Sequence, residues 1–377
     1  MKRIAIFSFY DKDGIADAYI KYLLSELCTV AERLVIVVNG KLTLSSRKMF
    51  ECFTNDIYIR DNIGFDIGAY TDTLIGYLEE NEIYKWDELI FCNDTFYGPF
   101  IRMKDIFRQM EVKNTEFWGL NFVDRGMLSH IQSYFLVFGK KIIESGALLY
   151  YLQHNINIFE KEIKNVYAKF EMGIFAFLKN RGYSFSTYAN TNLYDIYASP
   201  ELCIKKCGLP ILKKKCFYNE GDSCKYLMCT LKNIYNRGYN INYILENANR
   251  LYGFNCNEKE ILKNEEIVDE RENNQVLLGA ISESSFLNWI NGKEFYIYGT
   301  GIIARDIFYL YHEKMKGFKG FVISNNQKKE KELFGYPVFY YSEINSSSNI
   351  VMGIAKPLMK DILLNMKTTG SILTIWQ

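Results

Sequence analysis

The chain has 377 residues, more than one hydrophobic core usually holds, so we expect at least two domains. A hydrophobic content of 49% with 24% charged residues is typical of a folded protein and excludes an intrinsically disordered one. The 45 Lys and Arg residues only balance the 44 Asp and Glu residues, which argues against a nucleic-acid binder because such proteins carry a basic excess.

The N-terminus and the cysteines bear on the cellular compartment. The first apolar run is too short for the core of a signal peptide, and no stretch reaches the roughly 20 apolar residues of a membrane span. Nine cysteines, an odd number, fit free thiols in a reducing compartment. Those between 203 and 229 form no C-x-x-C pair and have no histidine among them, so we do not expect zinc. We predict a cytoplasmic protein, at most peripheral at the inner face of the cell membrane.

In the first half of the chain, apolar strands alternate with segments of helical spacing. Strands are predicted at 4–9, 34–38, 56–59 and 88–92, helices at 16–27 and 70–80, and a helix or turn at 45–53. Strands separated by helices indicate a largely parallel sheet covered on both faces. The predicted fold class is α/β, of the Rossmann type.

Polar residues follow these strands at their carboxyl ends, where open α/β sheets bind ligands. In the string RDNIGFDIGAY at 60–70, Gly64 and Gly68 bracket Asp66 at a helix start, where small residues let a ligand come close to the backbone. We predict a nucleotide or nucleotide-sugar site here, and the alternative is a pair of left-handed turns beside an ordinary strand end. The candidate residues at the strand ends are Ser8, Asn39, Arg60, Asp66, Asn93 and Asp94.

Two further candidates lie beyond this region. His130 precedes a predicted strand at 131–138, with Gln132 near its start, and another strand is predicted at 117–121. A lone histidine beside a strand is more often a satisfied polar residue than a catalyst, so we do not assign His130 as a general base. Glu171 lies in a predicted helix at 161–180 among aromatic residues, a setting that can raise the pKa of a carboxyl group and make it a base. The alternative is an exposed glutamate on an amphipathic helix.

The remainder of the chain carries weaker signals. The basic run Lys213-Lys214-Lys215 is usually a solvated face, although it could contact acidic phospholipids or a polyprenyl diphosphate acceptor. A helix is predicted at 226–245. Residues 251–290 include a sharp shift to polar composition and are predicted to be a partly helical linker between domains at 1–250 and 291–377.

The C-terminal segment contains a strand, a glycine turn and a helix start at 295–305. Gly299, Gly301 and Ala304 fit the dinucleotide fingerprint G-x-G-x-x-A. The next predicted strand, 320–323, is followed by Ser324-Asn325, where an NAD site wants an acidic residue for the ribose. We therefore expect a half-Rossmann module with a structural, oligomerising or regulatory role, and we do not expect it to bind NAD.

Six strings occur in a recognisable order: NIGFDIGAY (62–70), CNDTFYGPF (92–100), WGL (118–120), HIQSYFLVF (130–138), FEMGI (170–174) and GLPILKKK (208–215). Together they resemble the rhamnan-synthesis F-type glycosyltransferases, which build rhamnose-containing bacterial cell-surface polysaccharides. The resemblance covers about residues 1–250. It implies a GT-A-like nucleotide-sugar domain that moves a sugar, L-rhamnose from dTDP-rhamnose, onto a glycan or lipid-linked glycan acceptor in a single inverting displacement.

The same resemblance implies roles for individual residues. Asp94 would bind Mg²⁺ or Mn²⁺, although the D-x-D of such folds is reduced here to Cys92-Asn93-Asp94, so the metal could be dispensable and Arg60 or a lysine could hold the phosphates instead. Glu171 would be the base that deprotonates the acceptor. The residues that would border the base and ribose of the donor are Asn62, Gly64, Asp66 and Gly68.

Two other functions remain open from the sequence. One is an NAD-dependent sugar-modifying enzyme that uses the turn at Gly299. The other is a non-catalytic protein that binds nucleotide sugars or assists assembly, which the incomplete D-x-D permits. A homo-oligomer formed through the C-terminal module is compatible with each function.

Overall fold

The structure is a computed structural model that describes residues 1–79, 81–124, 126–156, 168–191, 194–197, 199–218, 223–263, 281–325, 327 and 330–376. The chain divides into two compact units. Unit 1 contains Met1–Val123, Ile131–Val166 and Phe177–Leu277, and unit 2 contains Asp124–His130, Tyr167–Ala176 and Leu278–Gln377. Much of the predicted linker, at 264–280, lies outside the described residues.

Unit 1 is built on a mostly parallel sheet. Its strands are β1 (Arg3–Phe9), β2 (Arg33–Asn39), β3 (Ile57–Arg60), β4 (Glu88–Asn93), β6 (Phe117–Val123), β8 (Phe135–Gly139) and β9 (Phe185–Ala189). They lie in the order β3-β2-β1-β4-β8-β6, with the short strand β7 (His130–Ile131) next to β6 and with β9 also paired to β6. Strand β8 runs antiparallel to both β4 and β6, whereas β3, β2, β1 and β4 are mutually parallel. The structure confirms the predicted α/β class.

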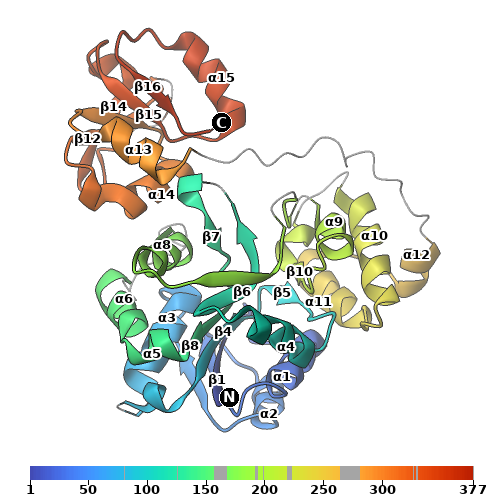
Figure 1. The fold of residues 1–377 in the computed structure, drawn as a ribbon. Helices are drawn as coiled ribbons and strands as arrows, with labels where there is room; N and C mark the ends of the chain where they lie inside the picture. The colour runs from blue at the N-terminus through green and yellow to red at the C-terminus, as the bar shows by residue number, and fades with distance from the viewer. Residues whose placement is uncertain are drawn as a thin grey trace. The chain divides into compact units, whose positions relative to one another are not determined.

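Helices cover both faces of this sheet. In Figure 1, α1, α4 and α11 lie on one side of the sheet and α3, α5 and α6 on the other. Shorter strands complete the region: β5 (Phe96–Tyr97), β7 (His130–Ile131) and β10 (Leu212–Lys213). The helices named in the first two thirds of the chain are α1 (Ala18–Leu27), α2 (Leu44–Glu51), α3 (Phe65–Asp72), α4 (Met103–Lys113), α5 (Lys140–Glu144), α6 (Ala147–Asn155), α8 (Gly173–Asn180), α9 (Pro200–Lys205), α10 (Ser223–Asn236), α11 (Asn242–Tyr252) and α12 (Glu258–Lys263).

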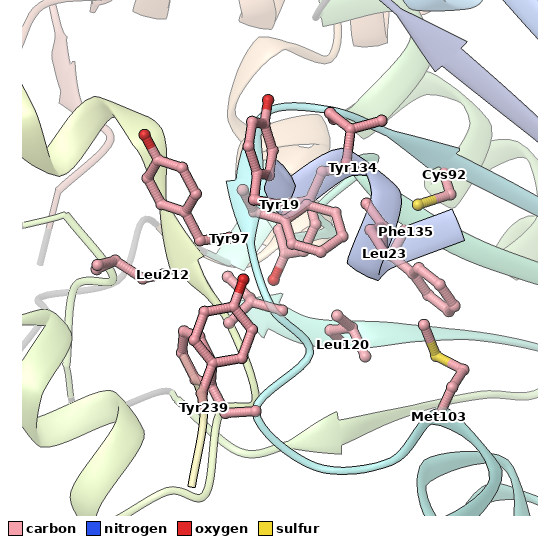
Figure 2. Close-up of a cluster of buried hydrophobic side chains, with 14 of the residues drawn as sticks. Tyr19, Leu23, Cys92, Tyr97, Met103, Leu120, Tyr134, Phe135, Leu212 and Tyr239 are labelled. Atoms are coloured by element: carbon pink, nitrogen blue, oxygen red, sulfur yellow. The ribbon is translucent and has the colours of Figure 1, made fainter. Parts of the chain in front are cut away.

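The core of unit 1 follows from the alternation of side chains along its strands. Phe7 and Phe9 of β1 belong to the buried cluster that includes α1, α4 and α11, and Figure 2 shows part of it, with Tyr19, Tyr97 and Leu212 among the labelled residues. On the other face, Tyr70 of α3 stacks on Phe91 of β4 with ring centroids 4.2 Å apart. Both faces of the strands are therefore buried, as in a two-sided α/β sheet.

Several predicted elements differ in their limits. The helix predicted at 70–80 begins earlier, as α3, and continues as a π-helical turn, Thr73–Tyr77. The strand predicted at 131–138 is divided into β7 and β8. The helix predicted at 226–245 is two helices, because the chain leaves α10 through Gly238, whose φ of +85° is incompatible with a continuing helix. The described part of the helix predicted at 161–180 is a π-helical turn, Ala168–Met172, followed by α8.

Unit 2 contains a second, smaller sheet in the order β13-β14-β12-β11-β15-β16. Its pairs are parallel except for β13 with β14. This arrangement confirms the predicted small Rossmann-like module. Its elements are α13 (Glu283–Ile290), β11 (Phe295–Tyr298), α14 (Ile302–Tyr311), β12 (Phe318–Ile323), β13 (Glu332–Leu333), β14 (Tyr336–Tyr340), β15 (Asn349–Met352), α15 (Lys356–Asn365) and β16 (Ile372–Thr374).

Two segments from the first half of the chain are part of unit 2. Met127, Leu128 and Met172 are buried in the same hydrophobic cluster as residues of α13, β11 and α14. The Tyr311 hydroxyl donates a hydrogen bond to the Met127 carbonyl at 2.9 Å, and the Met127 N–H donates to the Ile281 carbonyl at 3.1 Å. The core of this unit thus needs residues that lie far from the C-terminus in sequence.

The described helices are all too short or too polar to cross a bilayer.

Candidate functional site

The carboxyl ends of β1, β2 and β3 are joined by a chain of polar side chains. Asn39 donates from Nδ2 to Ser8 Oγ at 3.0 Å and accepts at Oδ1 from Arg60 Nη1 at 2.7 Å. Ser8 and Asn39 are buried. The structure therefore brings together three of the residues predicted from the strand ends.

Arg60 is held by three acceptors. Besides Asn39, its Nε donates to Asp72 Oδ2 at 2.7 Å and its Nη2 donates to the Ile63 carbonyl at 2.8 Å. A Cβ on Gly68 would lie 2.6 Å from that carbonyl and 2.8 Å from Nη2. Gly68 thus makes room for the guanidinium of Arg60, where the sequence suggested room for a ligand.

The turn before α3 has a left-handed backbone at two successive residues. Gly64 has a φ of +70° and Phe65 a φ of +53°. A positive φ is strained for a residue with a bulky side chain, and such strain is often found near functional sites. Asn62 lies in the same turn, and the turn places Asp66 in the first turn of α3.

Asp66 reaches the end of β4. Asn93 Nδ2 donates to Asp66 Oδ2 at 2.5 Å, and Asn93 Oδ1 accepts from the Thr95 hydroxyl at 2.7 Å and from the Thr95 N–H at 3.1 Å. Asn93 is buried. The side-chain amide therefore links the turn after β3 to the segment after β4.

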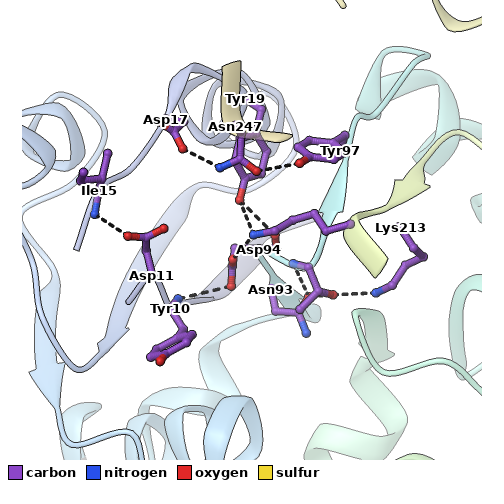
Figure 3. Close-up of polar contacts among 12 residues, drawn as sticks. Tyr10, Asp11, Ile15, Asp17, Tyr19, Asn93, Asp94, Tyr97, Lys213 and Asn247 are labelled. Carbon is purple, nitrogen blue, oxygen red and sulfur yellow. Dashed lines mark hydrogen bonds and ion pairs between the residues drawn. The ribbon is translucent and has the colours of Figure 1, made fainter. Parts of the chain in front are cut away.

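Asp94, next along the chain, is bound by a lysine. Its Oδ2 accepts from Lys214 Nζ at 2.8 Å, and its Oδ1 accepts from the Tyr10 N–H at 3.3 Å (Figure 3). The same Lys214 Nζ donates to the Tyr19 hydroxyl at 2.8 Å, which in turn donates to the Asp94 carbonyl at 3.2 Å. Asp94, Lys214 and Tyr19 are thus joined in a ring of hydrogen bonds within the protein interior.

This arrangement fixes the charges of the three groups. Burial acts to lower the pKa of Lys214, but the attraction and hydrogen bond of Asp94, together with the neighbouring Tyr97 and Tyr252, outweigh it, and the pKa of the lysine is raised above its usual 10.5. Burial, reinforced by the charge of Asp94, raises the pKa of Tyr19 well above its usual 10.0. At neutral pH, Lys214 is therefore an ammonium and Tyr19 a neutral hydroxyl.

The basic run at 213–215 is not the solvated face that is usual for such a sequence. Strand β10 pairs antiparallel with β5, so that Lys213 lies opposite Phe96, and the Lys214 N–H donates to the Thr95 carbonyl at 3.1 Å. Lys213 Nζ donates to Thr95 Oγ1 at 2.6 Å and lies 4.1 Å from the centre of the Tyr134 ring. Only Lys215 of the three is exposed.

A second buried network ties the loop after β1 to α11. Arg250 Nη2 contacts Asp11 Oδ2 and Asp17 Oδ2, each at 2.6 Å. Asn247 Nδ2 also donates to Asp17, and Asn247 Oδ1 accepts from the Tyr97 hydroxyl at 2.6 Å (Figure 3). Residues of α11 therefore hold the loop that carries Tyr10 in place.

Gln132 takes part in a polar cluster within unit 1. Its Oε1 accepts from Asn121 Nδ2 at 3.0 Å, and Asn121 Oδ1 accepts from the Tyr134 hydroxyl at 2.6 Å. The Tyr134 ring is also the one beneath Lys213. Gln132 is therefore connected through Asn121 and Tyr134 to the lysines.

His130 and Glu171 both belong to unit 2. His130 Nε2 lies 3.8 Å from Glu171 Oε2, and His130 Nδ1 lies 2.9 Å from the Leu128 carbonyl. Because a carbonyl can only accept, Nδ1 carries a proton and Nε2 is the nitrogen that faces the carboxylate. The two residues predicted separately from the sequence thus form a pair.

The expected divalent cation does not fit the observed surroundings of Asp94. Both carboxylate oxygens already accept hydrogen bonds, one from an ammonium, and a cation placed on either oxygen would be repelled by Lys214. Within the described part of the chain, no group of three or more His, Cys, Asp or Glu side chains could hold a metal ion.

Of the three fingerprint residues of the C-terminal module, Gly299 and Ala304 have structural reasons, and nothing in the structure explains Gly301. Gly299 has a φ of +108°, and a Cβ there would lie 2.9 Å from the Gly353 carbonyl oxygen. Ala304 is buried, while a Cβ on Gly301 would meet no atom within 4 Å. After β12, the Ser324 hydroxyl pairs with the Tyr298 hydroxyl at 2.6 Å, so this position offers a hydroxyl in place of a carboxylate.

Sequence reasoning missed the partners of Asp94. Tyr19 is a regular core position of α1, and Lys214 lies 120 residues from Asp94 along the chain. The only local signal was the basic run itself, whose composition is that of an exposed segment.

Fold and site together define an α/β protein with a cluster of polar side chains at the carboxyl ends of β1, β2, β3 and β4. A family profile described as Rhamnan synthesis protein F matches residues 34–280. The match confirms the resemblance seen in the six strings, and the chain belongs to the Rhamnan synthesis protein F family.

Two other proteins are similar over shorter stretches. "Uncharacterized protein y4gN" of Sinorhizobium fredii (strain NBRC 101917 / NGR234) is 26% identical over 151 residues, which are 39% of this chain and 39% of that protein. "Virulence protein VirA" of Vibrio anguillarum (strain ATCC 68554 / 775) is 27% identical over 134 residues, which are 35% of this chain and 41% of that protein. The chain spans about two fifths of the length of these relatives.

Among solved structures, a cytidylyltransferase from Leptospira borgpetersenii serovar Hardjo-bovis (strain JB197) is similar with a TM-score of 0.29 and 13% identity. The likeness covers 49% of this chain and 74% of the other.

Proposed function

We propose that the protein is a glycosyltransferase that moves a sugar from a nucleotide-diphosphate donor to a glycan acceptor. Membership of the Rhamnan synthesis protein F family supports this class. The observation that carries the proposal is the convergence of Ser8, Asn39, Arg60 and Asn93 at the ends of four adjacent parallel strands, since that edge is where open α/β sheets bind nucleotides.

The donor we propose is dTDP-L-rhamnose, and the acceptor is a growing cell-surface polysaccharide or its lipid-linked precursor. The family description, which names rhamnan synthesis, supports the sugar. The reaction would take place in the cytoplasm or at the inner face of the membrane, where activated nucleotide sugars would meet a lipid-linked acceptor.

The proposed nucleotide-sugar residues are those of the carboxyl edge and its neighbours: Ser8, Asn39, Arg60, Asn62, Gly64, Asp66, Gly68, Asn93 and Gln132. Glu171 is the proposed base, with His130 as its partner. In the transfer, Glu171 accepts the proton of the acceptor hydroxyl while the hydroxyl oxygen bonds to the anomeric carbon of the donor sugar. The bond from that carbon to the phosphate oxygen breaks, and its electron pair leaves with the nucleoside diphosphate. The hydroxyl oxygen attacks from the face opposite the leaving group, so the configuration of the anomeric carbon is inverted.

Thermal unfolding with a panel of dTDP, UDP, GDP and NADH tests the class of ligand. A ligand that binds only the folded protein stabilises it by about 2.7 kcal/mol at 100 times its Kd, so a true donor nucleotide should raise the Tm. A shift with dTDP is the expected result. A shift with NADH alone would overturn the proposal and direct attention to the turn at Gly299.

Transfer of labelled rhamnose to a membrane fraction tests catalysis. Replacing Glu171 by Gln should lower kcat by about 10²–10⁴-fold, the usual contribution of a general base, while leaving the affinity for dTDP unchanged. Glu144→Gln, at an exposed glutamate, is the matched control and should retain activity. Binding of dTDP-rhamnose without any transfer by the unaltered protein would favour the non-catalytic alternative.

A further inference from the structure

The ammonium of Lys214 is suited to bind an anion. Its Nζ makes hydrogen bonds to Asp94 Oδ2 and the Tyr19 hydroxyl, both at 2.8 Å. An ammonium has three N–H donors, so these two bonds leave one more. The side chain is 12% exposed, which keeps the group within reach of a ligand while burial strengthens its electrostatic effect.

The position of this ammonium is fixed by the backbone. The Lys214 N–H donates to the Thr95 carbonyl at 3.1 Å, directly beside the carboxylate that binds its side chain. The preceding residue, Lys213, is paired in β10 and places a second ammonium 2.6 Å from Thr95 Oγ1. Charges held in place before the reaction stabilise a developing charge more effectively than charges that must reorganise.

We propose that Lys214 neutralises the leaving nucleoside diphosphate, at the place where the family resemblance implied a divalent cation. This inference rests on the proposed function. As the anomeric carbon separates from the phosphate oxygen, the third N–H of Lys214 donates to a phosphate oxygen and stabilises the negative charge that gathers there. Asp94 is a positioning residue, because its Oδ2 orients the ammonium.

The test compares the affinities of the full-length protein for dTDP and for thymidine, measured by calorimetry in EDTA and again with Mn²⁺. The ratio of the two affinities reports on phosphate binding, because a general loss of structure would weaken both ligands. For the unaltered protein we expect a high ratio that is the same in EDTA and in Mn²⁺. Lys214→Met should lower this ratio at least tenfold, and Mn²⁺ should not restore it. Asp94→Asn should lower it by a smaller factor.

Three further variants make the result specific. Lys214→Arg keeps the positive charge and should retain most of the ratio. Lys215→Met removes the exposed lysine next to it in the same run and should change nothing. Lys214→Met leaves a buried carboxylate unpaired and could unfold the protein. The double variant Asp94→Asn with Lys214→Met removes both charges and avoids this problem. It should lower the ratio of the dTDP and thymidine affinities as much as Lys214→Met alone.

The outcomes separate this inference from the proposed function. If the double variant keeps the ratio, or if dTDP binding by the unaltered protein is lost in EDTA, the inference is wrong while a nucleotide-sugar enzyme remains. If the unaltered protein binds no dTDP, UDP or GDP under either condition, both the proposed function and this inference fail.

Discussion

Arg250 joins the loop after β1 to α11 through ion pairs with the aspartates of that loop. Its guanidinium, in a side chain that is 23% exposed, contacts the largely buried carboxylates of Asp11 and Asp17 and, at 3.6 Å, the exposed carboxylate of Asp13. Burial acts to raise the pKa of Asp11, but the hydrogen bonds from Arg250 and from the N–H groups of Ile15 and Asp13 together outweigh it, and the pKa is lowered below its usual 3.8. The loop contributes the Tyr10 N–H to Asp94, so this ion pair also supports the candidate site.

Replacing Arg250 by Met should lower the free energy of unfolding by about 3 kcal/mol at pH 7, because two largely buried carboxylates lose their partner. Urea denaturation measures this loss. Arg47→Met is the matched control, since Arg47 pairs with Glu51 on the surface and is 47% exposed, and such pairs contribute at most about 1 kcal/mol. Equal losses in the two variants would contradict the assigned importance of the buried pair.

The loss in the free energy of unfolding that Arg250→Met causes should also depend on pH. A carboxyl group whose pKa is lowered in the folded state stabilises the protein above its unfolded pKa, and this stabilisation disappears as the pH falls through the lowered value. For Asp11 the stabilisation is complete well above pH 3.8 and is lost below it. The difference between the unaltered protein and the variant should therefore narrow as the pH falls below 3.8. A difference that stays constant down to pH 3 would argue against Asp11 as the cause.

At the scale of the elements, the pairing of β10 with β5 decides whether Lys214 reaches Asp94. Gly98 follows β5 with a φ of +127°, and a Cβ there would lie 2.7 Å from the Pro210 carbonyl oxygen. The Phe100 N–H donates to that same carbonyl at 2.7 Å. A side chain at Gly98 would therefore push apart the two segments that carry Asp94 and Lys214.

Gly98→Ala should be more destabilising than Gly208→Ala, and it should also weaken dTDP binding. Gly208 has a positive φ of +71° but a Cβ there would meet nothing within 4 Å, so its replacement adds only the backbone strain of about 1–2 kcal/mol. The Gly98 variant adds a clash with backbone to that strain. Urea denaturation and calorimetry with dTDP compare the two, and similar effects on both properties would show that the close approach to Pro210 is unimportant.

The sequence predicts the polar residues at the carboxyl edge of the sheet well, because the apolar runs that define the strands are local in sequence. Long apolar runs define β1, β2 and β4, and parallel neighbours bring their carboxyl ends together, so the meeting of Ser8 and Asn39 follows from strand order alone. The approach of Lys214 depends on pairing between two strands of two residues each, which is too short to produce a periodic pattern. Gly68 shows the same limit, since its reason is the side chain of Arg60 and no pattern around Gly68 reveals it.

For the whole molecule, chain order and spatial units do not coincide. Residues 124–130 and 167–176 belong to unit 2, although the sequence places them within the transferase-like region. Their apolar side chains, including Leu128, complete the core around β11 and α14. Leu120 is equally buried but belongs to the core of unit 1, and long-range packing decides which of the two cores each leucine joins.

Hydrogen exchange should reveal this division. Leu120 and Leu128 are each 2% exposed, and truncating a buried leucine to alanine costs about 2–5 kcal/mol. In the full-length chain, Leu128→Ala should accelerate amide exchange in β11 and β12 and leave β1 and β2 unchanged, whereas Leu120→Ala should do the reverse, because each unit opens according to its own stability. Exchange followed by mass spectrometry of peptides measures both. If Leu128→Ala accelerated exchange in β1 as much as in β11, the two units would unfold as one cooperative body, and the division of the chain into two units would not extend to their stability.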